Sequence, residues 1–475
     1  MANNFFFQFS YQEWPMATCL EIIENQLVSG DSATLIDLTG KYKSEHEFPI
    51  ADRLKIAIVN MRLRKSKIYL NLLGKHQSNF RVMNDISGPR LTPDAELIAL
   101  ADEVAYLELI AVVREAEPSK EKYAPRLYKY RQTFLDTYFA AVRILNTEKI
   151  GHVYLYNGRF LQERAIWEAC LFLGIPIIFY EKFNPSWKNR YFLFKNPTHS
   201  PSYRSSIMLD FGRNLFSTDI GRYKTVGNNW FENRMLGKTQ DYTSKQNNLV
   251  QHSFTKPFVV FFHSSEDELI TTDLQSKTWG NQISALNSLV EVLKEIGGKN
   301  LVIRAHPNLL HKSENEIQLW KSLGAKLESK YSWITFVDSE SDISSYQLIM
   351  DAESVVTVGS TIGVEAAYWG KKSILIGRAF HEDMGITMNP ENKVQLRELL
   401  ELEITKEDLE TRKFCALDYA VFHELGGIKF SSVDYRLKNN RDDYSFRGFV
   451  IRQPRVVSLL MRLDSLLRKV LKNAY

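Results

Sequence analysis

The chain has 475 residues, of which 44% are hydrophobic and 24% are charged, the proportions of an ordinary globular protein with room for two or three domains. Its net charge of +4, from 60 basic and 56 acidic residues, is too small to indicate a nucleic-acid partner. The three distant cysteines do not form a disulfide framework or a metal spacing. Because there is no long apolar run and no signal-peptide pattern, we expect a cytoplasmic protein.

The first half of the sequence predicts strands that alternate with helices. The expected order is strand 4–10, helix 14–28, strand 33–38, helices 94–115 and 125–146, strand 152–156, helix 160–173 and strand 175–180. Residues 54–73 show no clear period and stay unassigned. From 184 to 256 the periodicity fades among prolines and asparagines, which indicates an interdomain connection with some helix.

A second alternating block begins near residue 257. It is expected to contain strand 258–262, helix 281–296, strands 301–305 and 333–337, helix 344–352, and strands 355–358 and 373–376. Residues 455–472 form a basic amphipathic pattern, which could lie on an anionic membrane surface or pack across the two blocks. We therefore expect an α/β fold with parallel sheets and boundaries at 1–255, 256–450 and 451–475.

The most informative segment is the turn Gly359-Ser360-Thr361, which joins a buried strand to a short helix. Open α/β sheets bind ligands at the carboxyl ends of their strands, and a helix N-terminus offers free backbone N–H groups to an anion. The two hydroxyl groups add donors, and no capping-box acid stands three residues later. Glu365 is left to accept sugar hydroxyls. The turn therefore predicts a site for a phosphate with a ribose beside it.

Two other strand ends of the second block are polar. Ser264 and Ser265 follow one strand, and Arg304, His306 and Pro307 follow the next. Each has a plain structural alternative: a helix cap for the serines, an ordinary loop for the histidine, and a simple tight turn for Gly359-Ser360-Thr361. If the strands are parallel, all three segments line one edge. Their coincidence favours a ligand site in which Arg304 and His306 neutralise phosphate.

The first block offers candidates for the other substrate. Asn157 and Arg159 follow a strand, and Glu181 follows the next. Glu13 is the only carboxylate of the loop after the first strand. Arg159 could hold an anion, and Glu181 or Glu13 could act as a base. A surface turn and a surface ion pair are about equally compatible with these residues.

Several other chemistries lack support in the sequence. There is no Walker loop, no Gly-x-Gly-x-x-Gly motif and no Gly-x-Ser-x-Gly elbow. The acidic run 338–342 could bind a cation, but it precedes a helix, so capping explains it better. Residues 381–383, His-Glu-Asp, could ligate a metal, although a solvated loop is the better interpretation. We expect neither a metal nor a bound cofactor.

The segments 304–307 (Arg-Ala-His-Pro), 342–346 (Asp-Ile-Ser-Ser-Tyr) and 358–371, which includes the Gly-Ser-Thr turn, resemble bacterial capsule and lipopolysaccharide glycosyltransferases. These include capsule-synthesis Kdo transferases and polysialyltransferase-like proteins. The likeness covers roughly 151–377. It implies a GT-B fold, in which two Rossmann-like domains face each other across a cleft. The first domain would hold the acceptor and the second the nucleotide sugar, and His306, Ser360 and Thr361 would bind the CMP part of the donor.

From these residues and the resemblance we expect transfer of a sugar from a nucleotide-sugar donor to a bacterial surface polysaccharide, such as capsule, lipopolysaccharide or O-antigen. A CMP-Kdo or CMP-sialic-acid type of donor is favoured, and a UDP-sugar is open. The acceptor would be a glycan or a lipid-linked glycan. Alternatives are a polyol-phosphate transferase, a non-hydrolysing sugar-nucleotide epimerase, or a non-catalytic nucleotide- or glycan-binding subunit of an assembly complex. The sequence lacks the Glu-x7-Glu pattern of many retaining enzymes, because Thr357 stands eight residues before Glu365.

Overall fold

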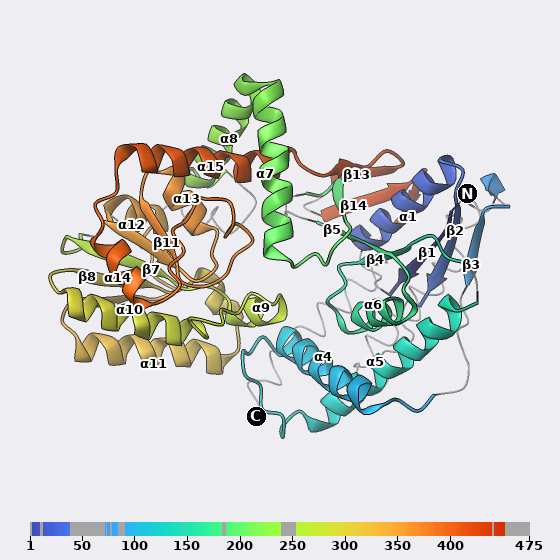
Figure 1. The fold of residues 1–475 in the computed structure, drawn as a ribbon, viewed down its shortest axis with the longest axis horizontal. Coiled ribbons are helices and arrows are strands. Elements are labelled where there is room, and N and C mark those ends of the chain that lie inside the picture. Colours follow the sequence, from blue (N-terminus) through green and yellow to red (C-terminus); the bar gives the residue numbers. More distant parts are fainter. Residues whose placement is uncertain are drawn as a thin grey trace. The chain divides into compact units, whose positions relative to one another are not determined.

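The computed structural model describes residues 2–9, 13–38, 72, 74–76, 78–83, 91–147, 149–182, 187–238, 253–438 and 441–451. The chain divides into two compact units (Figure 1). Unit 1 comprises the described parts of 1–109, 119–198 and 427–475, and unit 2 comprises those of 110–118 and 199–426. The sequence placed the boundaries after residues 255 and 450. The structure differs because helices between 201 and 235 pack within unit 2, and the chain returns to unit 1 at 427.

Unit 1 is built on a largely parallel sheet in the order β12-β6-β5-β4-β1-β2-β3. Its strands are β1 (Asn3–Gln8), β2 (Ser32–Asp37), β3 (Phe80–Met83), β4 (Val153–Tyr156), β5 (Ile177–Glu181), β6 (Arg190–Phe194) and β12 (Ile428–Lys429). Among the described strands of this sheet, β6 pairs in the antiparallel direction with both β5 and β12. Phe5, Phe6 and Phe7 are all buried, as expected for a strand covered on both faces.

The described helices between these strands are α1 (Glu13–Val28), α4 (Ala95–Val113), α5 (Ala124–Leu145) and α6 (Leu161–Leu173). The division into units assigns the last residues of α4 to unit 2. The helix α6 stops at Gly174, whose φ of 66° is the left-handed conformation that commonly ends a helix. The sequence predicted this stop.

The last described segment of the chain completes unit 1. Strands β13 (Val433–Lys438), β14 (Arg441–Phe446) and β15 (Phe449–Val450) form a small antiparallel sheet that packs against α1. Glu21 on α1 is fully buried and accepts hydrogen bonds from the backbone N–H groups of Ser431, Ser432 and Val433 at 2.7, 2.8 and 3.0 Å. A buried carboxylate needs such donors, so this contact ties the two distant parts of unit 1 together.

Unit 2 contains a five-stranded parallel sheet in the order β11-β10-β7-β8-β9. The strands are β7 (Phe258–Phe262), β8 (Asn300–Arg304), β9 (Ile334–Val337), β10 (Ser354–Thr357) and β11 (Lys372–Leu375). The helices are α7 (Pro201–Thr218), α8 (Ile220–Met235), α9 (Glu266–Thr271), α10 (Gln282–Ile296), α11 (Glu314–Lys330), α12 (Ser345–Asp351), α13 (Ile362–Tyr368), α14 (Lys393–Glu401) and α15 (Lys406–Leu425), with a 3₁₀ turn, η2 (Pro307–His311).

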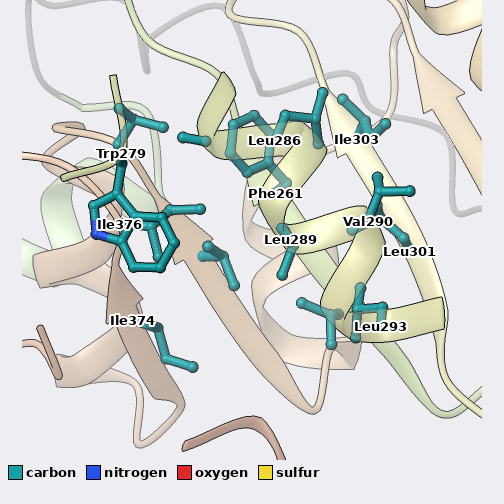
Figure 2. Packing of buried hydrophobic residues seen from close by; sticks show 14 of the residues in the cluster. Phe261, Trp279, Leu286, Leu289, Val290, Leu293, Leu301, Ile303, Ile374 and Ile376 are labelled. Carbon is teal, nitrogen blue, oxygen red and sulfur yellow. The ribbon is translucent and has the colours of Figure 1, made fainter. Parts of the chain in front are cut away.

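The apolar face of α10 forms much of the unit 2 core against the sheet (Figure 2). The side chains that meet there are buried and come from α10, β7, β8, β11 and the flanking loops: Phe261, Trp279, Leu286, Leu289, Val290, Leu293, Leu301, Ile303, Ile374 and Ile376. Helices α7 and α8 form a hairpin that packs with α15 on another part of the unit (Figure 1).

The predicted α/β class with two Rossmann-like units is confirmed, whereas the expected cleft between them stays a prediction. Almost every expected strand and helix is present within a few residues of its predicted bounds. The sequence missed β3, β6, β12, the small sheet and the helices α9, α11, α14 and α15, and it predicted only some helix in the region where the α7–α8 hairpin lies. The amphipathic pattern at 455–472 and nearly all of 54–73 lie outside the described residues.

Candidate functional site

Neighbouring strands of unit 2 end side by side at one edge of the sheet. Thr357 at the end of β10 is paired with Phe262 at the end of β7, which is paired with Arg304 at the end of β8. The polar segments after these three strands therefore share this edge. The predicted parallel alignment is confirmed, and it places the three segments at successive strand spacings of about 4.8 Å.

The strand order of unit 2 reverses between β7 and β10. From β7 the chain continues outward to β8 and β9, and then returns to the other side of β7 to form β10 and β11. Ligands of open α/β sheets bind outside the carboxyl ends of the strands at such a reversal. The loops that carry Ser264 and Ser360 border this point, and His306 follows the next strand. This topology supports a ligand site at these loops, although the role of each side chain stays a prediction.

The His306 turn is fixed by a second histidine that the sequence interpretation missed. The Nδ1 atom of His263 accepts a hydrogen bond from the backbone N–H of His306 at 3.0 Å, and the His263 ring lies 4.0 Å from the ring of Trp320. Burial, with Lys312 and Arg304 nearby, lowers the pKa of His306 to about 4. His306 is therefore neutral near pH 7 and offers a phosphate a hydrogen bond rather than a charge.

A buried ion pair anchors the far end of the same turn. The side chain of Lys312 is 3% exposed, and its Nζ atom lies 2.6 Å from Oδ1 of Asp267 on α9. A long charged side chain is buried at this level only when it is paired. The pair links the segment after β8 to the helix after β7, so the two loops form one rigid surface. Asp267 and Lys312 gave no distinctive sequence signal, because each looks like an ordinary surface charge.

The Gly359-Ser360-Thr361 turn is tightly packed on its glycine side. A Cβ atom added to Gly359 would lie 2.8 Å from the carbonyl oxygen of Arg378 and 2.9 Å from Cδ2 of Leu269. The Oγ atom of Ser360 accepts a hydrogen bond from the N–H of Ile362 at 3.3 Å. Ser360 is partly exposed and Thr361 is exposed, so both hydroxyl groups can meet a ligand.

The serines after β7 differ in their surroundings. The backbone N–H of Ser264 donates to Oε1 of Gln282 at 2.6 Å, while its side chain stays partly exposed. Ser265 occupies the N-cap position of α9, but its side chain makes no capping hydrogen bond. The simple helix-cap interpretation therefore fails for this hydroxyl group. Pro307 begins η2 directly after His306.

Two predicted donor residues are placed differently from expectation. Arg304 is 5% exposed, and its guanidinium group donates to the backbone carbonyls of Asp338 and Ser341. It therefore holds the loop after β9, and burial lowers its pKa to about 10. Glu365 is 1% exposed and bonds Arg234 and Tyr346, rather than standing free for sugar hydroxyls. In both cases the position of the residue at the strand end or helix start was predicted correctly, but the direction of its side chain was not.

Unit 1 repeats the same strand reversal between β1 and β4. Asn157 follows β4 with a φ of 56°, a left-handed conformation that asparagine tolerates better than most residues. Its Oδ1 atom accepts from the N–H of Arg159 at 3.2 Å. Glu13 is the first residue of α1, after β1, and is partly exposed. The predicted candidates Glu13, Asn157 and Arg159 thus border the reversal point of unit 1.

Glu181 is more constrained than a free base would be. One oxygen accepts from the N–H of Lys182 at 2.7 Å, and the other contacts Nδ2 of Asn157. Lys182 itself lies with Nζ 4.8 Å from the ring centre of Trp14. Burial, followed by the nearby Lys188, lowers the pKa of Lys182 to about 8. Lys182 is a further polar group of this edge that the sequence interpretation did not select.

The residues that could suggest a metal do not form a centre. No group of three or more potential ligands is present in the part of the chain that the structure describes. His381, expected in a solvated loop, is buried at 2% exposure, so the expectation was wrong for this side chain, whereas Asp383 in the same loop is exposed. Among the described helices, none has both the length and the apolar character that crossing a bilayer requires.

Comparison with known proteins addresses unit 2 directly. Residues 199–402 match the family model of capsule polysaccharide biosynthesis proteins. This region is similar to capsule polysaccharide biosynthesis proteins. The predicted recognition is confirmed at this level, and the same match supports the predicted enzyme class, a glycosyltransferase. The matched region contains every predicted donor residue, together with the α7–α8 hairpin. No curated protein sequence matches the chain.

Solved structures give only distant likenesses. The β-Kdo 2,4 transferase KpsC of Thermosulfurimonas dismutans has 13% identity and a TM-score of 0.35, covering 57% of this chain and 80% of that chain. Its β-Kdo 2,7 transferase counterpart has 15% identity and a TM-score of 0.37, covering 68% and 88%. The UDP-GlcNAc 2-epimerase from Neisseria meningitidis, bound to UDP-GlcNAc, has 11% identity and a TM-score of 0.28, covering 98% and 99%. At these TM-scores the likenesses carry no argument about activity.

Proposed function

We propose that this protein transfers a sugar from a nucleotide-sugar donor to a growing bacterial surface polysaccharide, without a metal ion. The observation that carries the proposal is the strand reversal of unit 2, where Ser264, Ser360 and, one strand away, His306 follow the carboxyl ends of parallel strands. The family match over 199–402 supports a polysaccharide context for this site.

The proposed chemistry is stabilisation of the departing nucleotide. As the glycosidic bond to the donor phosphate breaks, negative charge grows on the phosphate oxygens. Fixed hydroxyl and imidazole donors stabilise such charge, and removing one from comparable sites costs about 3 kcal/mol of barrier. Ser360, Thr361 and neutral His306 would supply these donors, with Ser264 and Ser265 as further contacts. Arg304 would act by holding the neighbouring loop rather than by touching phosphate.

Unit 1 would supply the groups that bind and activate the acceptor hydroxyl. Glu13 and Glu181 are the candidates for the base, and Glu181 would have to exchange its present contacts with Asn157 and Lys182 for the acceptor hydroxyl. Asn157 and Arg159 would contact the acceptor glycan. The donor remains a nucleotide sugar of CMP or UDP type, and the cytoplasmic location remains a prediction.

The first experiment is a thermal-shift titration with CMP, CDP, UDP and GDP. A nucleotide that binds only the folded state at 100 times its Kd stabilises the protein by about 2.7 kcal/mol, so its melting temperature should rise. No shift with any nucleotide would contradict the proposed donor site. Binding without donor consumption would indicate a non-catalytic subunit, donor conversion without acceptor would indicate an epimerase, and turnover of a CDP-polyol would indicate a polyol-phosphate transferase.

The second experiment tests the residues. We expect His306→Ala and Ser360→Ala each to lower turnover by about 100-fold or more, while the melting temperature changes little. The matched control is Ser329→Ala, since Ser329 lies exposed on α11, away from the strand reversal. Wild-type turnover in both site variants would refute the assignment of this edge.

A further inference from the structure

The α7–α8 hairpin makes three regularly spaced contacts with α13, the helix that follows the Gly-Ser-Thr turn. Asn228 accepts a hydrogen bond from the hydroxyl of Tyr368 at 2.9 Å. The ring of Phe231 stacks on the Tyr368 ring at 3.9 Å, with 8° between the planes. Arg234 donates from Nε and Nη2 to Oε1 of Glu365 at 3.2 and 3.0 Å. Residues three apart lie on one face of a helix, so a single face of α8 holds α13.

The ion pair between Arg234 and Glu365 is largely buried, and further contacts hold both side chains. The side chain of Glu365 is 1% exposed, and that of Arg234 is 15% exposed. The second oxygen of Glu365 receives the hydroxyl of Tyr346 on α12. The guanidinium of Arg234 also lies 4.7 Å from the ring centre of Trp230. A buried carboxylate held by a fork-shaped cation has little freedom, so it fixes the rotation of α13 about its axis.

The other side of the turn is held by α7. Ser205 donates from Oγ to the carbonyl oxygen of Phe380 at 2.9 Å, and the guanidinium of Arg204 lies 4.0 Å from the Phe380 ring centre. Two residues earlier in the same loop, the carbonyl oxygen of Arg378 packs so closely on Gly359 that a Cβ atom there would lie only 2.8 Å away. Helix α7 therefore supports the loop against which the polar turn rests.

From these contacts we propose that Arg234 and Ser205 are positioning residues, through which the α7–α8 hairpin sets the geometry of the Gly359–Thr361 turn for the donor phosphate. The inference rests on the proposed function and extends it to residues that do not touch the donor. It assigns a role to a hairpin that is distant from the turn in sequence but belongs to the same unit.

The test separates positioning from stability. Arg234→Met alone leaves Glu365 buried without its cation, which destabilises the fold. In the double variant Arg234→Met with Glu365→Gln, no unpaired charge remains, and we expect the melting temperature to return to within a few degrees of wild type. The Kd for the nucleotide that wild type binds, among CMP, CDP, UDP and GDP, should nevertheless stay at least tenfold weaker by calorimetry. Arg234→Lys keeps the charge but loses the fork-shaped donor set and the stacking on Trp230, so its Kd should lie between those of wild type and the double variant.

Two further variants keep the inference open to refutation. Ser205→Ala removes one hydroxyl and should fold normally, with nucleotide binding about threefold weaker. Lys224→Met, on an exposed position of α8, is the control and should bind as wild type does. Wild-type Kd in both the double variant and Ser205→Ala would overturn the inference. If wild type itself binds no nucleotide, the proposed function fails instead, so the two failures are distinguishable.

Discussion

Acid should destabilise unit 2 through His381, and the size of the effect follows from its burial. His381 is 2% exposed, and its buried Nε2 atom has no hydrogen-bond partner among the residues that the structure describes. Burial lowers its pKa from the ordinary 6.5 to about 4. Between these values the unfolded chain binds a proton at this residue and the folded chain does not. Lowering the pH therefore favours unfolding, and the stability present at pH 7 is lost progressively down to about pH 4.

The magnitude can be worked out for a pH change from 7 to 5. At pH 5 a histidine with a pKa of 6.5 is almost fully protonated, whereas one with a pKa of about 4 is almost fully neutral. The difference amounts to about 2 kcal/mol of unfolding free energy for this single residue. His306 and His423, whose pKa values are lowered to about 4 and about 3, act in the same direction. Asp418 opposes them, because burial raises its pKa to about 6.

The assay compares wild type with His381→Gln in urea denaturation at pH 7 and pH 5, followed by tryptophan fluorescence. Glutamine cannot take up the proton, so the variant should lose about 2 kcal/mol less stability than wild type over this pH change. Its stability at pH 7 serves as the internal control for any packing defect. An equal loss in both proteins would refute the account of His381.

Three more predictions concern other sites. Gly377→Ala should destabilise unit 2 by about 3 kcal/mol or more, because its Cβ would overlap the carbonyl oxygen of Val358; an unchanged urea midpoint would contradict this. Glu21→Ala should cost about 3 kcal/mol, since the N–H groups of Ser431, Ser432 and the buried Val433 all lose their acceptor. Hydrogen exchange of the 431–433 amides should speed up, and unaltered exchange would speak against the prediction. Nucleotide binding near pH 6 should take up protons in wild type and fewer protons in His306→Gln, because a bound phosphate raises the pKa of His306. Calorimetry in two buffers of different ionisation enthalpy measures this proton uptake. Equal uptake by the two proteins would exclude the contact between His306 and phosphate.

The sequence predicted the edge of the sheet better than the directions of its side chains. The strands before Ser264, His306 and Ser360 are strongly apolar and end at polar residues, so both their existence and their ends could be inferred. Parallel pairing followed from the alternation of strands and helices. Arg304 and Glu365 were misjudged because their partners, the carbonyl of Ser341 and the side chain of Arg234, are distant in sequence.

The boundary between the units could not be predicted from the sequence either, because it also depends on contacts between residues that are distant in the chain. The hairpin residues 201–235 contain glycines and asparagines that weaken the helical period, and their packing on α15 assigns them to unit 2. Likewise, nothing in the sequence indicates that the Nδ1 atom of His263 accepts the N–H of His306, because the two residues are distant in the chain. Long-range partners of this kind leave no local signal in a single sequence.

The return of the chain to unit 1 has a consequence for the order of assembly during synthesis. A nascent chain emerging from the ribosome presents Glu21 early, but the backbone donors at 431–433 emerge only after the whole of unit 2. The edge of β6 likewise waits for β12. Unit 2, which is nearly continuous in sequence, can therefore reach its native packing while the earlier-made unit still lacks its closing strands. A premature stop near residue 426 would therefore damage unit 1, most of which is translated first, and spare unit 2, which is translated later.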